Sequence, residues 1–211
     1  DCISAYLLKK NKTKKIIGET ANGEWRNVEN FLKLSSNYKS FQVIRDPRAV
    51  LMSWKKLTYS SGYKYLNIIF NWIDAINYSE KNLKKFKSNR YLRLKFEDIH
   101  SEPKKNIQNI CKFAGVKVDK NMLLQKKWPK LLRNSFNSIN VSSYNNKHSF
   151  GFSRQRTTNW IEHIENWELA LTQYLLKDYL KKLNYQIIPV DKKYLKIGLN
   201  IIKKDKLLKK N

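Results

Sequence analysis

Residues 41–53 read F-Q-V-I-R-D-P-R-A-V-L-M-S, and they decide the fold that the sequence predicts. The apolar run that ends at Ile44 is typical of a short buried strand. Asp46 and Pro47 then favour the start of a helix, because aspartate caps helix N-termini and proline fits the first helical turn. A strand that leads directly into a helix delivers Arg45 to the carboxyl end of a sheet, where open α/β folds bind ligands.

This junction has the properties of a phosphate site. The N–H groups and the positive dipole end of the helix favour an anion. Arg45 adds a planar fork of donors suited to phosphate, and Ser53, one to two turns into the helix, adds a hydroxyl donor. Arg48 is the next candidate for such a phosphate contact, although a solvated arginine in the first helical turn is an equally good interpretation. The junction therefore predicts a pocket for a phosphomonoester.

The remaining chain predicts one layered α/β domain over residues 1–190, with parallel strands, followed by a basic amphipathic tail over residues 191–211. Strands are expected over residues 39–44, 91–96 and 185–190. Helices are expected over residues 27–34, 47–57, 63–86, 103–114 and 165–183. In the long helix 63–86, the expected core face consists of Leu66, Ile69, Phe70, Ile73 and Ile76.

Three collinear stretches together resemble the sulfotransferases that use 3′-phosphoadenosine 5′-phosphosulfate (PAPS). Arg-Asp-Pro-Arg at residues 45–48, followed five residues later by Ser53, is similar to the 3′-phosphate-binding element of that family. Residues 91–103, Y-L-R-L-K-F-E-D-I-H-S-E-P, resemble its strand that ends in Tyr-Glu-Asp and leads to a helix. Residues 149–160, S-F-G-F-S-R-Q-R-T-T-N-W, resemble its cofactor-covering loop and the tryptophan after it. The matches span roughly residues 15–190.

The resemblance, to the carbohydrate and tyrosylprotein-like branch, implies a P-loop-kinase-like layered fold that is incomplete at its N-terminus. It implies an enzyme that moves a sulfuryl group from PAPS to a hydroxyl acceptor, expected to be a carbohydrate, without a metal. Arg45 and Ser53 would hold the 3′-phosphate of the nucleotide. Phe96 falls where the family usually has tyrosine near the adenine, and it keeps a stacking face without the hydroxyl.

The covering loop offers three further polar residues near the nucleotide, Ser153, Arg154 and Arg156. Among them Arg154 is our choice for a phosphate contact. Trp160 and the later Trp167 are expected to be core residues rather than ligand contacts.

Two family features are missing. The glycine-rich loop that holds the 5′-phosphosulfate is absent, so either truncation before Asp1 or degeneration of the enzyme is implied, and this chain alone need not be active. Residues 18–25, G-E-T-A-N-G-E-W, replace the family's lysine with Glu19 or Thr20. Glu19 is the candidate catalytic base, against the alternatives of an ordinary surface carboxylate and of a base upstream of Asp1.

The charge leaves other functions open. Forty-three Lys and Arg residues against seventeen Asp and Glu residues give a net charge of +26. Such an excess favours a polyanion, a small anion or an anionic membrane as partner. The alternative function is therefore a non-enzymatic protein that binds polyanions or nucleic acid, although no nucleic-acid motif supports it. The tail 191–211 either contacts an anionic membrane or forms a last helix packed on the core.

The cellular location of the protein and the roles of its cysteine and histidine side chains are less constrained by the sequence. No run of about 18 apolar residues suggests a membrane span, so we expect a cytoplasmic protein. Cys111 lies in an apolar helical pattern and is expected to be a buried thiol. His100, His148 and His163 lack metal-ligand spacing and are expected to lie on the surface or in loops.

Overall fold

A two-stranded parallel sheet forms the centre of the molecule. The computed structural model describes residues 16, 18, 20, 23–57, 62–124 and 152–204. Strand β1 (Ser40–Ile44) pairs in parallel with β2 (Tyr91–Lys95), and Ile44 lies opposite Lys95. Both strands therefore end at the same edge of the sheet. The predicted α/β fold with parallel strands is confirmed.

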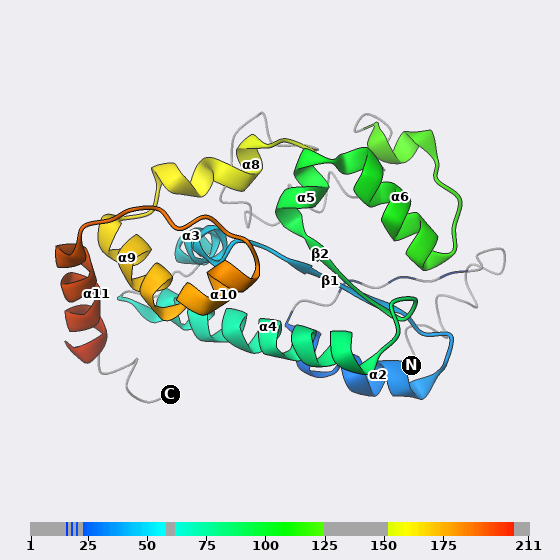
Figure 1. Ribbon diagram of the computed structural model, residues 1–211, viewed down its shortest axis with the longest axis horizontal. Helices are drawn as coiled ribbons and strands as arrows, with labels where there is room; N and C mark the ends of the chain where they lie inside the picture. Colours follow the sequence, from blue (N-terminus) through cyan, green and yellow to red (C-terminus); the bar gives the residue numbers. More distant parts are fainter. Residues whose placement is uncertain are drawn as a thin grey trace.

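Helices cover both faces of this sheet. Helix α4 runs along one face, and α5 and α6 lie on the other (Figure 1). The helical elements in chain order are η1 (Glu24–Arg26), α2 (Val28–Leu34), α3 (Pro47–Leu57), η2 (Lys64–Asn67), α4 (Ile68–Lys85), α5 (Phe96–Ser101), α6 (Pro103–Ala114), η3 (Lys120–Leu123), α8 (Gln155–Thr158), η5 (Asn159–Glu162), α9 (Asn166–Leu175), α10 (Lys177–Lys182) and α11 (Lys192–Lys204).

The core lies where α3, α4 and α9 meet. Helix α3 begins as predicted, since the Asp46 carboxylate accepts a hydrogen bond of 2.9 Å from the backbone N–H of Arg48. Trp160 and Trp167 are buried in this core, as expected. The predicted core face of α4 needs one correction. Phe70 is 56% exposed, and Trp72 packs in the core instead.

The expected strand over residues 185–190 does not form, because side chains rather than a neighbouring strand satisfy its backbone. The Gln173 amide both donates to the Ile188 carbonyl and accepts from the Ile188 N–H, each at 2.8 Å. The Arg48 guanidinium donates to the Gln186 carbonyl at 2.8 Å. With these polar groups bonded to side chains, the segment does not join the sheet.

One strand prediction and one helix prediction also change. The strand predicted over 91–96 ends at Lys95, and a short helix, α5, starts at Phe96. The single helix predicted over 165–183 is two helices, because the backbone at Leu176 (φ −110°, ψ 13°) leaves the helical range. The sequence has no glycine or proline at this break that would have predicted it. Helix α6 ends as expected at Gly115, whose φ of 79° is left-handed.

The C-terminal helix α11 packs against α9. Gly198 is buried there, and a Cβ atom at this position would lie 3.0 Å from the Leu171 Cβ. The lysines of α11 remain exposed, and contact of residues 191–211 with an anionic membrane remains a prediction. Among the described residues, no helix is long and apolar enough to cross a membrane.

Candidate functional site

The carboxyl ends of β1 and β2 bring Arg45 and Phe96 together. Arg45 follows Ile44, and Phe96 follows Lys95, which is the register partner of Ile44. The guanidinium carbon of Arg45 lies 4.5 Å from the centroid of the Phe96 ring. An aromatic ring attracts a guanidinium without using its N–H donors, which remain suited to hydrogen bonds with an anion.

The donors of Arg45 are only partly used. Its Nη2 donates to the Arg156 carbonyl oxygen at 3.0 Å, and its own carbonyl accepts from the Trp72 indole N–H at 2.9 Å. The Nε atom of Arg45 is buried and has no hydrogen-bond partner among the residues that the structure describes. A buried donor without a partner is costly, so this atom is a candidate contact for a ligand.

The segment of residues 152–156 lies against this pair, as the resemblance implies for the covering loop. The Ser153 N–H donates to Nδ1 of His100 at 3.0 Å, and the Phe152 ring lies 6.0 Å from the His100 ring. The carbonyl oxygen of Arg156 accepts a hydrogen bond from the Arg45 guanidinium. Three segments far apart in sequence therefore converge on the edge where the strands end.

The N-terminus of α3 is less open to an anion than the sequence predicts. The Asp46 carboxylate accepts from the Arg48 N–H, and Glu97 Oε1 accepts from the Asp46 N–H at 2.9 Å. Two protein carboxylates thus already occupy the positive end of the helix. Burial raises the pKa of Glu97, with a further contribution from the nearby Asp46. The Tyr185 hydroxyl donates to the second Glu97 oxygen at 3.1 Å.

Arg48 is neither a ligand contact nor a solvated arginine. It is 2% exposed, and its Nε and Nη2 bond both oxygens of Asp46 at 2.9 and 2.7 Å. Its Nη1 donates to the Gln173 side chain and to the Gln186 carbonyl. The guanidinium also stacks over Trp160, 4.6 Å from the ring centroid. Both interpretations from the sequence are corrected, because the donors hold α3 to α9 and to the segment after α10.

The other predicted site residues have different positions. Ser53 is half-buried in α3, about two turns after Asp46 and therefore on the same side of the helix. Arg154 is exposed at the start of α8, and its carbonyl accepts from Thr157. Glu19 lies outside the described residues. Ligand contacts by Ser53 and Arg154, and the catalytic role of Glu19, remain predictions.

His100 is the site residue that sequence reasoning missed. Instead of lying on the surface, it is 8% exposed, and its ring centroid lies 4.3 Å from that of Phe96. Burial lowers the pKa of His100, and the positive charges of Arg156 and Arg45 lower it further. Its place four residues after Phe96, one helical turn, is a signal that would have placed it beside that ring if the short α5 had been expected.

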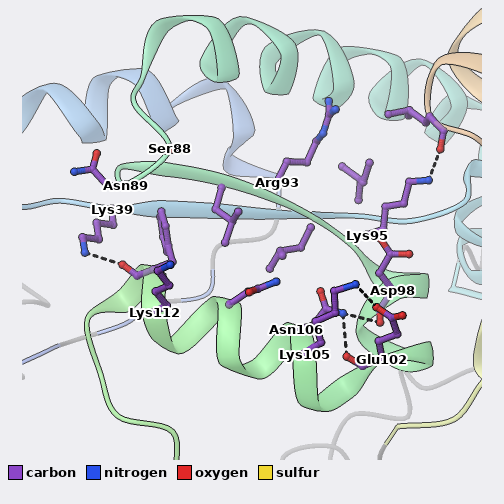
Figure 2. Close-up of a pocket in the computed structure, with 16 residues that line it drawn as sticks. Lys39, Ser88, Asn89, Arg93, Lys95, Asp98, Glu102, Lys105, Asn106 and Lys112 are labelled. Atoms are coloured by element: carbon purple, nitrogen blue, oxygen red, sulfur yellow. Dashed lines mark hydrogen bonds and ion pairs between the residues drawn. The ribbon is translucent and has the colours of Figure 1, made fainter.

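A separate pocket of about 650 Å³ lies between β2 and α6 (Figure 2). Its polar lining is mixed in charge, with Lys39, Lys105, Lys112, Asp98 and Glu102. Arg93 and Lys95, also on its border, point toward the opposite side of the sheet in the figure, where Arg93 pairs with Glu80. Arg45 and Phe96 do not line this pocket, and its mixed charge selects no ligand. Among the described residues, no group of three or more His, Cys, Asp or Glu side chains could hold a metal ion.

Comparison with known proteins agrees with this fold. Two solved structures share the fold: the sulfotransferase domain of the Synechococcus PCC 7002 olefin synthase (TM-score 0.64, 18% identity) and that of the curacin biosynthetic pathway (TM-score 0.65, 15% identity). The alignments cover 89% and 88% of this chain, which spans 64% and 68% of those two domains.

No curated protein sequence matches the chain. Residues 4–120, more than half of the chain, match the sequence pattern of the sulfotransferase family, and this stretch includes β1, β2 and the Arg45–Phe96 pair. The chain therefore belongs to the sulfotransferase family.

Proposed function

We propose that the protein is an enzyme that transfers a sulfuryl group from PAPS to a hydroxyl acceptor, with a carbohydrate as the acceptor. In this proposal Arg45 binds the 3′-phosphate of the nucleotide, and Phe96 offers its ring to the adenine. Sulfuryl transfer needs little covalent chemistry from the protein, because positioning and cationic donors supply most of the acceleration, by analogy with phosphoryl transfer.

The observation that carries this proposal is the state of Arg45. It lies where the strands end, its guanidinium is oriented by the Phe96 ring, and its Nε lacks a partner among the described residues. Other arginines nearby are engaged by protein groups: Arg48 by Asp46, and Arg93 by Glu80. A phosphate bound to Arg45 would supply the acceptor that its buried donor lacks.

The alternative function, non-enzymatic binding of polyanions or nucleic acid, is not favoured. Both structural neighbours are sulfotransferase domains, and the family match covers the strand ends at which Arg45 lies. The charge of +26 remains compatible with an acidic acceptor, and the carbohydrate is proposed from the family resemblance alone.

Calorimetric titration with adenosine 3′,5′-bisphosphate, the product of PAPS, tests the role of Arg45. Arg45→Ala should weaken binding about 10- to 100-fold, because hydrogen bonds to charged groups contribute about 1.5–3 kcal/mol each. Arg26→Ala is the matched control, since Arg26 is an exposed arginine whose partner is Asp74. Equal affinity of wild type and Arg45→Ala would remove Arg45 from the site, and no binding by wild type would refute nucleotide binding by this chain.

A further inference from the structure

His100 connects two parts of the candidate site. It belongs to α5, directly after β2, and it accepts a hydrogen bond from the backbone N–H of Ser153 at 3.0 Å. Ser153 lies just before α8, 53 residues later in the chain, and α5 and α8 are neighbours in space (Figure 1). The bond is therefore a tertiary contact between the end of the sheet and the covering segment.

This contact requires one protonation state. A backbone N–H can only donate, so Nδ1 of His100 must carry a lone pair and the imidazole must be neutral. A second proton, on Nδ1, would face the Ser153 N–H and replace an attraction with a repulsion. The bond therefore exists only while His100 is neutral.

Arg45 holds the other end of the same segment. Its Nη2 donates to the Arg156 carbonyl at 3.0 Å, so residues 153–156 are bonded at both ends, to His100 and to Arg45. The ring of Phe96 contacts both anchors, with its centroid 4.3 Å from that of the His100 ring and 4.5 Å from the guanidinium carbon of Arg45. A shift of the segment at Ser153 would therefore disturb the surroundings of both Arg45 and Phe96.

We propose that His100 is a positioning residue, whose neutral Nδ1 holds the Ser153 end of residues 152–156 against Arg45 and Phe96 and whose protonation releases that end. The consequence for nucleotide affinity depends on the proposed function. The contact between His100 and the segment does not depend on the proposed function, since it is present in the protein without ligand.

The surroundings fix the direction of the pH response. The charged groups that act on His100 come from two elements packed against it, Arg156 in α8 and Arg45 after β1, and both are cations. Together with burial they keep the pKa of His100 below its usual 6.5. The neutral ring therefore predominates at pH 7.5, and the hold on residues 152–156 weakens only as the pH falls below 6.5 toward the lowered pKa.

Hydrogen exchange on the full chain without nucleotide is the first test. The readout is the protection factor of the peptide that contains the Ser153 amide, corrected for the intrinsic pH dependence of exchange. His100→Leu removes the acceptor and should lower protection about three- to tenfold at pH 7.5. His100→Asn supplies a side-chain oxygen that does not titrate, so it should keep most of that protection. As the pH is lowered from 7.5 through the lowered pKa of His100, wild type should lose protection and His100→Asn should not.

Titration with adenosine 3′,5′-bisphosphate is the second test. At pH 7.5, His100→Leu should bind about three- to tenfold more weakly than wild type, and His100→Asn nearly as well as wild type. When the pH is lowered through the pKa of His100, wild type should lose more affinity than His100→Asn. Protonation of the nucleotide phosphate affects both proteins equally, so the difference between them reports on His100.

The outcomes of the two tests distinguish a failure of the positioning role from a failure of the proposed function. Equal exchange in wild type and His100→Leu, or exchange in His100→Asn as fast as in His100→Leu, would overturn the positioning role. The expected exchange pattern without nucleotide binding by any variant would support the positioning role and refute the proposed function. If His100→Leu does not fold, the pH dependence of exchange in wild type and in His100→Asn still tests the positioning role. Only an acceptor that titrates makes the protection of the Ser153 amide differ between the two proteins as the pH falls.

Discussion

Replacing Arg48 with methionine should destabilise the protein strongly without touching the ligand site. The substitution keeps most of the apolar stem and removes the guanidinium, which is 2% exposed and bonds both oxygens of Asp46. It leaves the Asp46 carboxylate, 5% exposed, without its cation, and it removes the donor to the Gln186 carbonyl. Breaking a buried ion pair from one side typically costs about 3–5 kcal/mol.

A loss of about 4 kcal/mol is a large part of the 5–15 kcal/mol that usually separates folded from unfolded chains. For a chain of 211 residues it corresponds to a fall in melting temperature of roughly 8–16 °C. Urea unfolding followed by tryptophan fluorescence measures the free energy. Arg154→Met is the matched control, because Arg154 is exposed and its loss should change stability by less than about 0.5 kcal/mol.

A double variant separates the ion pair from other effects of the substitution. Asp46→Asn combined with Arg48→Met removes both charges, so it should be less destabilised than the sum of the two single variants. A loss below about 1 kcal/mol for Arg48→Met would refute the structural role. Unchanged stability with weaker binding of adenosine 3′,5′-bisphosphate would return Arg48 to the ligand site.

Two further perturbations test the packing of α11 and the charge of Glu97. Gly198→Ala should lower the free energy of unfolding in urea by about 1–3 kcal/mol, because its Cβ would lie 3.0 Å from the Leu171 Cβ. Asn200→Ala, at an exposed position in the same helix, is the control and should be neutral or stabilising. Equal stability of Gly198→Ala and wild type would contradict the close packing. Glu97→Gln should be at least as stable as wild type at pH 7. Burial raises the pKa of Glu97, so its contribution to stability is greatest below the usual 4.5 and is lost as the pH rises through the raised value. Unfolding free energies measured from pH 4 to 8 should therefore depend less on pH in Glu97→Gln, and a steeper dependence would show that the fold needs the ionised carboxylate.

The strand-to-helix junction could be predicted because its signals are local. The apolar run before Arg45, the cap at Asp46 and the proline after it all act within one turn of the chain, and β1 and α3 have nearly the predicted bounds. The contact of Arg45 with Phe96 needs one further fact that the sequence does not supply, namely that β1 and β2 are neighbours in the sheet. Two parallel strands place the residues after their last positions at one edge, whatever the rest of the fold does.

Contacts between distant segments could not be predicted in this way. The Arg48 guanidinium bonds Gln186, 138 residues away, and that bond both buries the arginine and helps to keep residues 185–190 out of the sheet. A pattern of alternating apolar residues carries no information about such a partner. The same holds for His100, whose acceptor role depends on a backbone N–H 53 residues further along the chain.

The net charge of +26 describes the solvent-facing lysines better than it describes the site. Carboxylates bind two cations of this part of the fold: Asp46 binds Arg48, and Glu80 binds Arg93 within β2. Lys95 at the end of β2 has a carbonyl and an aromatic ring as neighbours, those of Leu183 and Tyr185. Arg45 differs from Arg48 and Arg93 because an aromatic ring and a carbonyl, rather than a carboxylate, orient its guanidinium, so its charge is not neutralised. An anion at this edge would therefore be selected by the placement of Arg45, at the point where two strands and a distant segment meet, and a protein with far fewer lysines could keep the same selectivity.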